Sequence, residues 1–211
     1  MVKDGIYYGV ALSAAGALLW YLIQPAYSAP LFLLALFCLY FFRDPDRIIP
    51  DGPVAVSPAD GKVVAIIGDG VGGESTRISI FLNIFDVHVN RAPIAGKIAN
   101  VEYTKGRFLV ASRAAASSQN ERNTVTIVGS ESGQSTCVRF AQIAGLIARR
   151  IVFYKKLGDT VAKGERVGLI KFGSRVDIFL GPEWEIKVRP GERVSGGSSI
   201  LAKRREVARQ S

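Results

Sequence analysis

Apolar residues are distributed unevenly along this chain. No charged residue occurs in residues 5–42, whereas charged residues and glycines are frequent from Arg43 onward. The first apolar run, residues 6–23, is about long enough to cross a hydrocarbon core of ~30 Å as a helix. Gln24-Pro25 interrupts the pattern, and a second, shorter apolar run ends at Arg43.

A helical hairpin fits both lengths, because one continuous helix would overshoot the bilayer. The hairpin leaves Lys3 and Arg43 on the same side, and positive residues favour the cytoplasmic face. We therefore expect residues 1–43 to anchor the protein in the cell membrane, with residues 44–211 forming a separate domain on the cytoplasmic face. A cleaved signal peptide fits less well, because a second apolar run follows the first.

Short β-branched segments separated by glycine follow a Pro- and Asp-rich linker. The pattern G-x-x-V-x-x-G-x-x-[VI] occurs at residues 158–167 and again at residues 191–200. This is the hairpin pattern of biotinyl and lipoyl domains, in which glycine supplies a positive φ and valine packs inward. We predict a mainly β body of the barrel-sandwich, lipoyl-like type, with one weak helical segment at residues 112–117. The expected strands are residues 62–67, 77–81, 97–103, 123–128, 136–141, 151–153, 166–170, 176–180 and 185–188.

The formal net charge of +9 favours anionic partners. The sequence has no zinc-finger spacing, RNA-binding signature or basic zipper, so nucleic acid is not the expected partner. Beside an apolar N-terminal segment, an anionic lipid surface explains the charge better. Cys38 and Cys137 lie in different settings, and a disulfide framework is not expected.

His88 is the single histidine and the side chain best suited to general acid–base chemistry near neutral pH. Strand alternation would place it on one face with Asp86 and Asn90. Metal binding is not expected, since no second histidine or cysteine stands at ligand spacing. Taken alone, a histidine in a strand is more often structural.

Asp60 is a candidate to orient the histidine, although Asp-Gly before a strand is also an ordinary turn. Gly173-Ser174 is a candidate for self-cleavage, although this dipeptide too is usually a turn. A serine hydroxyl can attack the preceding carbonyl and move the acyl group from nitrogen to oxygen, and His88 is the base available at neutral pH. Elimination from that ester leaves dehydroalanine, which hydrolyses to a pyruvoyl group.

A set of motifs appears in one order along residues 41–181. They are FFRDPDRIIP, VSPADGKV, FLNIFDVHVNRAPIAGKI, NERNTV, QIAGLIARRIV and GDTVAKGERVGLIKFGSRVDIFLG. Each is degenerate alone, but together and in this order they resemble the phosphatidylserine decarboxylase family, in its short, pyruvoyl-dependent branch.

The resemblance implies self-cleavage between Gly173 and Ser174, with Asp60 and His88 serving this step. It gives a β chain, residues 1–173, and an associated α chain, residues 174–211, that begins with a pyruvoyl group made from Ser174. As a carboxy-lyase of this family, the protein would form a Schiff base between that group and the serine headgroup of phosphatidylserine. Loss of CO₂ then gives phosphatidylethanolamine, with no metal or pyridoxal phosphate, and His88 is expected to supply the proton.

One departure from the family concerns histidine. Longer members carry two histidines near this strand, and Arg91 stands where the second would be. His88 therefore serves both steps, or another group takes one of them. Candidate ligands for the substrate phosphate or carboxylate are Asn90, Arg91, Arg122, Asn123, Arg149 and Arg150.

Two other interpretations remain at this stage. The same chemistry could act on archaetidylserine, an archaeal ether lipid, or the chain could be a membrane-anchored barrel-sandwich adaptor without catalysis. The sequence leaves the number of copies in the assembly open, a homo-oligomer included.

Overall fold

The computed structural model describes residues 2–69, 75–111, 115–131, 134–146, 150–171 and 174–205. The chain divides into two compact units, Met1–Asp46 and Arg47–Ser211.

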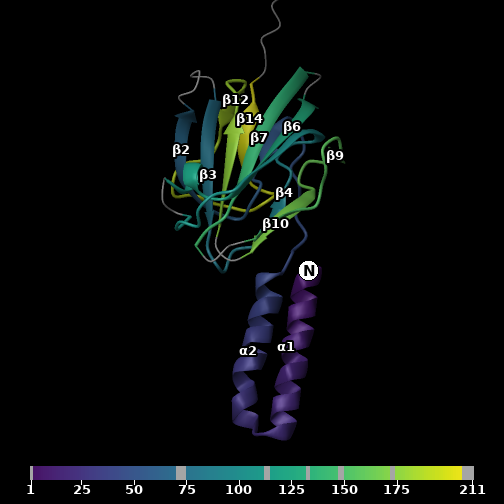
Figure 1. Ribbon diagram of the computed structural model, residues 1–211. Coiled ribbons are helices and arrows are strands. Elements are labelled where there is room, and N and C mark those ends of the chain that lie inside the picture. The colour runs from purple at the N-terminus through teal and green to yellow at the C-terminus, as the bar shows by residue number, and fades with distance from the viewer. Residues whose placement is uncertain are drawn as a thin grey trace, which may run out of the picture. The chain divides into compact units, whose positions relative to one another are not determined.

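The N-terminal unit is a hairpin of two helices, α1 (Lys3–Leu22) and α2 (Pro25–Phe41), which lie side by side in Figure 1. Glycines on α1 allow the close approach, since a Cβ at Gly9 would lie 2.8 Å from Leu39 Cδ2. Among the described helices, α1 alone is both long and apolar enough to cross a membrane, and α2 is apolar but shorter.

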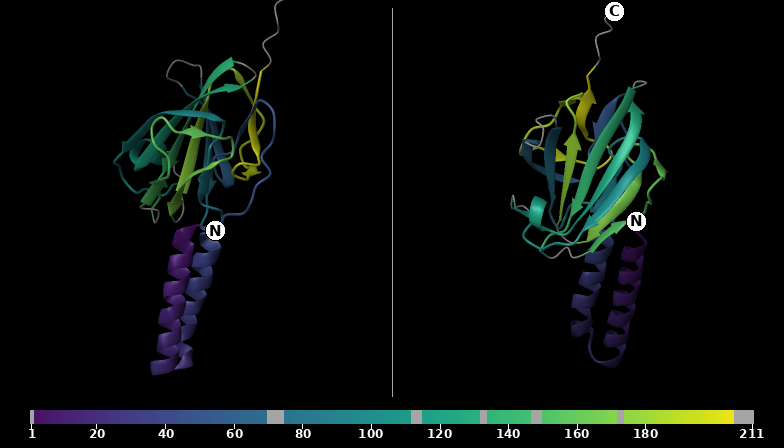
Figure 2. Two further views of the ribbon diagram at one scale, coloured as in Figure 1. Left: turned by 90° about the vertical axis from the view of Figure 1, so that its right-hand side faces the viewer. Right: turned by 45° about the horizontal axis from the view of Figure 1, so that its top comes forward.

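The C-terminal unit is built from antiparallel strands in three sheets, seen from two directions in Figure 2. The largest sheet has the order β13 (Arg193–Val194), β2 (Gly61–Asp69), β3 (Ser75–Leu82), β11 (Ser174–Leu180), β7 (Gln134–Ile143), β6 (Arg122–Glu131), β5 (Gly96–Thr104) and β9 (Thr160–Val161). The second sheet has the order β1 (Val54–Val56), β14 (Ile200–Arg204) and β12 (Trp184–Ile186). The third has the order β4 (Val89–Arg91), β10 (Arg166–Lys171) and β8 (Arg150–Phe153).

The hydrophobic core lies between the large, curled sheet and the two small ones. Alternate residues of β11, Val176, Ile178 and Leu180, are fully buried in it. Ile170 from β10 and Leu201 from β14 join the same core from the small sheets. The mainly β prediction with an apolar helical N-terminus is therefore confirmed.

The repeated glycine pattern has the physical basis that the sequence suggested. Gly158, Gly164, Gly191 and Gly197 all have φ between +75° and +92°. A residue with a side chain would be strained at these angles, so glycine is required in the turns. The valines between them, Val161, Val167 and Val194, are buried.

The expected strands all occur, although the expected strand at residues 185–188 is β12, which ends at Ile186. A short helix, α3 (Ala116–Gln119), overlaps the end of the weak helical segment, whose residues 112–114 lie outside the described part of the chain. The strand expected through Asp86, His88 and Asn90 is β4, which begins only at Val89, so Asp86 and His88 precede it. The strands that the sequence did not indicate are β1, β9, β13 and β14. Runs of two to five residues are too short to show a period.

Candidate active site

Ser174 is the first residue of β11 and is fully buried. It lies on the core-facing side of the strand, two residues before Val176. Its Oγ has no hydrogen-bond partner among the described residues. Leaving a buried hydroxyl unpaired costs about 1–3 kcal/mol, so such a group calls for a functional explanation.

Strand pairing brings Asp60 to the same end of the large sheet as Ser174. In β3, Leu82 pairs with Ser174 of β11 on one side, and Phe81 pairs with Lys62 of β2 on the other. Asp60 directly precedes β2, so about two strand spacings, ~10 Å, separate its backbone from that of Ser174. The loop that follows Leu82 carries His88.

Two neighbouring connections link the large sheet and the third sheet. One leads from β3 to β4 and the other from β10 to β11, and β3 pairs with β11 as β4 pairs with β10. The Ile170 N–H donates to the His88 carbonyl at 3.3 Å. His88 is thereby held beside the strand that leads directly to Ser174. Gly173, the predicted cleavage partner, lies outside the described residues.

His88 is 1% exposed, and its Nδ1 lies 2.9 Å from the Asp86 carbonyl oxygen. A carbonyl oxygen can only accept, so the proton of the neutral ring is on Nδ1. The lone pair is then on Nε2, which is the tautomer that accepts a proton there. The Asp86 carboxylate is engaged elsewhere, with Arg193 and with the Asn83 N–H.

The Asp60 carboxylate accepts hydrogen bonds from Arg47 Nη2, at 2.7 and 2.9 Å, and from the Gly196 N–H at 2.8 Å. These contacts fix the carboxylate at the start of β2. The role of Asp60 toward His88 stays a prediction.

A chain of buried amides lies on the core-facing side near Ser174. Asn123 Nδ2 donates to Gln142 Oε1 at 3.0 Å, and Gln142 Nε2 donates to Asn90 Oδ1 at 2.9 Å. Sequence reasoning included Asn90 and Asn123 but missed Gln142. A signal was present, because Gln142 occupies an alternate position with the core residue Phe140 in β7.

Comparison with known proteins shows which family the chain belongs to. A sequence model of the family described as phosphatidylserine decarboxylase matches residues 34–202. The chain belongs to the phosphatidylserine decarboxylase family. A relative named phosphatidylserine decarboxylase proenzyme, from Solibacter usitatus, is 64% identical over 97% of both chains. Proteins of the same name are 49% identical in Desulfotalea psychrophila, over 81% of each chain, and 46% identical in Cupriavidus pinatubonensis, over 86% of this chain and 84% of the relative.

The substrate ligands expected for a phosphatidylserine decarboxylase lie in different settings. Arg91 is buried, its Nη1 donates to the Gly164 carbonyl at 3.0 Å, and its side chain packs against Gly197. Arg122 is half-buried at the start of β6. Arg150 is exposed, and Arg149 lies outside the described residues.

A buried ion pair supports the other face of β11, and sequence reasoning missed it. Arg175 Nε donates to Asp177 Oδ1 at 2.6 Å, and Arg175 Nη2 donates to Ser79 Oγ at 2.5 Å. Ser117 from α3 donates to Asp177 Oδ2 at 2.9 Å. These bonds fix the residue next to Ser174 in place.

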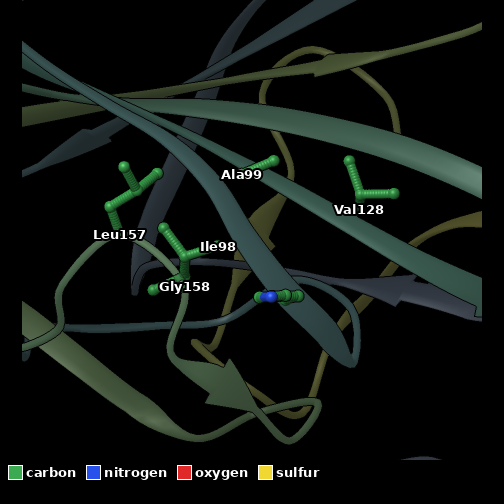
Figure 3. A pocket seen from close by; sticks show the side chains of 6 residues that line it. Ile98, Ala99, Val128, Leu157 and Gly158 are labelled. Carbon is green, nitrogen blue, oxygen red and sulfur yellow. The ribbon is translucent and has the colours of Figure 1, made fainter.

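An apolar groove of about 460 Å³ lies between β5, β6 and the loop before β9 (Figure 3). Val128 and Leu157 line it, and Lys97 is the one titratable residue of its lining. Val128 is six residues along β6 from Arg122, about 20 Å away, so the groove is remote from the Ser174 end of the sheet. Within the described ranges, no group of three or more His, Cys, Asp or Glu side chains could hold a metal ion.

Proposed function

We propose that this protein is a phosphatidylserine decarboxylase made as a proenzyme, which cuts its own chain between Gly173 and Ser174. The observation that carries the proposal is the buried, unpartnered Oγ of Ser174, at the strand end that the His88 loop adjoins. A structural serine would satisfy its hydroxyl, whereas a nucleophile needs one that is not tied to another acceptor.

In the proposed processing step, His88 Nε2 removes the proton from Ser174 Oγ as Oγ attacks the carbonyl carbon of residue 173. The acyl group moves from nitrogen to oxygen, and the proton passes to the released amine. Elimination then frees residues 1–173 with a terminal carboxylate, and water converts the dehydroalanine that remains into a pyruvoyl group and ammonia. Asp60, held by Arg47, supplies negative charge at this end of the sheet for the imidazolium that forms.

The residues around Ser174 fit a pyruvoyl group at that position. Such a group supplies a carbonyl that accepts the electrons released when CO₂ leaves the substrate. Asn90 Nδ2 would be the open donor nearest to it, and the burial of His88 and the amides would exclude water. His88 Nε2 holds the proton for the product carbon, so one histidine serves both steps of the reaction.

Arg122 is our candidate for the substrate phosphate. It pairs with Ile143 of β7, which in turn pairs with Arg175 of β11, so it lies at the same end of the sheet as Ser174, on the face that Arg175 occupies. Its Nη1 donates to the Ser118 carbonyl at 2.9 Å, and the guanidinium retains donors for a phosphate.

A diacyl lipid does not leave the membrane readily, so the site should meet the bilayer. Residues 1–43 would hold the protein there, with the catalytic domain on the cytoplasmic face. Phe85, in the loop before His88, is 63% exposed, and an aromatic side chain suits the membrane interface. Each nearby cation adds about 1 kcal/mol of attraction to an anionic leaflet.

The alternatives are weaker on these observations. An adaptor has no use for a buried serine whose hydroxyl is unpaired. The relatives are named for phosphatidylserine, which favours the diacyl lipid over archaetidylserine.

The function is tested with purified protein and vesicles that contain phosphatidylserine. We expect release of CO₂, formation of phosphatidylethanolamine, and loss of activity when borohydride is added with substrate. Formation of phosphatidylethanolamine at the same rate by Ser174→Ala would contradict the proposal.

A further inference from the structure

The amide chain Asn123–Gln142–Asn90 has a direction that a backbone carbonyl determines. Gln142 Nε2 donates to the Val152 carbonyl at 3.3 Å as well as to Asn90 Oδ1. Since a carbonyl only accepts, the nitrogen of Gln142 must face Val152 and Asn90, and its oxygen must face Asn123. Asn90 must therefore accept with Oδ1 and is left with Nδ2 as the last donor of the chain.

This last donor is buried and has no acceptor. Asn90 is fully buried, and its Nδ2 has no hydrogen-bond partner among the described residues. The chain itself fits closely, because a Cβ at Gly168 would lie 2.8 Å from Gln142 Nε2. A satisfied chain would end on an acceptor, so a donor left open in such a tight arrangement indicates an acceptor that is present during the reaction.

The open donor lies near the other unpaired buried group of the site. Gln142 pairs with Val176, so Ser174 lies diagonally from Gln142 on the same face, about 7–8 Å away between Cα atoms. Asn90 lies on β4 and is hydrogen-bonded directly to Gln142. His88 precedes Asn90 by two residues, just before β4 begins. The unpaired Nδ2 and the unpaired Oγ are thus close together at one end of the core.

We propose that Asn90 Nδ2 donates a hydrogen bond to the carbonyl oxygen of Gly173 when Ser174 attacks, and that Gln142 is the positioning residue that fixes the direction of this donor. The inference rests on the proposed self-cleavage. Attack by Oγ on the carbonyl carbon moves one electron pair onto that oxygen, and the pair returns when the bond to the Ser174 nitrogen breaks. A fixed donor stabilises the charge in between, and loss of one such donor slows reactions by about 10²–10³-fold.

The most direct test is Asn90→Asp in the full-length chain. This change keeps the volume and the oxygen that accepts from Gln142, and it removes the Nδ2 donor. If Asn90 had only a structural role, Asn90→Asp should leave the cleavage rate nearly unchanged. We instead expect self-cleavage to slow by about 10²–10³-fold. Gln142→Glu should have a similar effect, because the new carboxylate draws Asn90 Nδ2 toward itself. Cleavage is followed by gel electrophoresis after cell-free synthesis, beside the wild-type chain.

Asn120→Ala is the matched control. Asn120 is also a buried amide, but its Nδ2 is satisfied by the Leu109 and Ala144 carbonyls. The Asn120→Ala variant should lower the melting temperature more than Asn90→Asp does, when each is combined with Ser174→Ala to prevent cleavage. With Ser174 present, Asn120→Ala should still cleave at nearly the wild-type rate. A Gln119→Glu chain controls for an added charge at an exposed site.

Hydroxylamine shows whether Asn90→Asp slows the formation of the ester or its elimination. It cleaves an ester at residue 173 and leaves serine at the new N-terminus, so it should not restore fast cleavage in Asn90→Asp if ester formation is the slow step. The proposal is overturned if hydroxylamine restores it, if Asn90→Asp cleaves as fast as the wild type, or if that variant cleaves normally and loses only decarboxylation. If the wild-type chain itself stays whole, the proposed function fails instead.

Discussion

At the scale of single residues, the proposed site depends on which ring nitrogen of His88 carries the proton and on the unpaired hydroxyl of Ser174. The bond between His88 Nδ1 and the Asp86 carbonyl fixes the base as Nε2. Ser174 Oγ is kept buried without a partner among the described residues, beside the Arg175–Asp177 pair on the opposite face of its strand. A hydroxyl in this setting is unreactive until a base removes its proton.

His88→Ala tests the base directly. We expect the variant to remain a single uncleaved chain, because its sequence contains no other histidine. Gel electrophoresis after overnight incubation checks this, with the wild type cleaved in parallel. Normal processing of His88→Ala would exclude His88 as the base.

The residues proposed to react could be predicted from the sequence, and the residues that support them could not. Ser174, His88 and Asp60 stand in motifs of fixed order, so the resemblance identified them. Gln142 and the Arg175–Asp177 pair act through contacts between strands far apart in the chain. Those contacts depend on strand order in the sheet, which no local pattern in the sequence determines.

At the scale of elements, the paired connections β3–β4 and β10–β11 form the site. The sequence indicated the longer strands through their alternation and the turns through the repeated glycines. It indicated a strand around His88 but not its bounds, because β4 begins at Val89 and holds Asn90 but not His88. A strand of three residues becomes visible only through its pairing with β10.

The turn before β10 gives a pH-dependent test of this region. Burial raises the pKa of Glu165, but hydrogen bonds from Lys155 Nζ and the Ala162 N–H outweigh it, so the pKa lies below its ordinary value of 4.5. A lowered pKa stabilises the fold above about pH 4.5, and the contribution is lost as the pH falls through the folded value.

Lys155→Met should therefore lower the free energy of unfolding at pH 7 by about 0.2–1 kcal/mol. The difference from the parent chain should shrink at pH 3.5. Denaturant unfolding of the two chains, both carrying Ser174→Ala, measures it. A difference that is constant with pH would contradict the proposed pairing.

The loop between β3 and β4 should contact lipid. Phe85→Ser should reduce turnover of phosphatidylserine in vesicles by about 10- to 100-fold, because an inserted aromatic ring contributes about 1.5–3 kcal/mol. Turnover of a water-soluble short-chain phosphatidylserine should change little. Leu157→Ser, at an equally exposed apolar residue of the remote groove, serves as the control. Equal losses on both substrates would place the effect of Phe85 in the site, not at the membrane.

At the scale of the whole molecule, an apolar helical hairpin and a mainly β unit share one chain. The composition alone distinguishes these parts, since the absence of charge from residues 5–42 is visible without a structure. The curl of the large sheet and the closure of its core by two small sheets are not visible, because they arise from pairings such as β1 with β14, far apart in sequence.

The proposed function requires that the peptide bond between residues 173 and 174 breaks and that Ser174 does not remain a serine. Denaturing mass spectrometry of the purified protein tests this most directly. We predict two chains, residues 1–173 and 174–211, with a pyruvoyl group at the start of the smaller one. A single intact chain of 211 residues that still decarboxylates phosphatidylserine would contradict it.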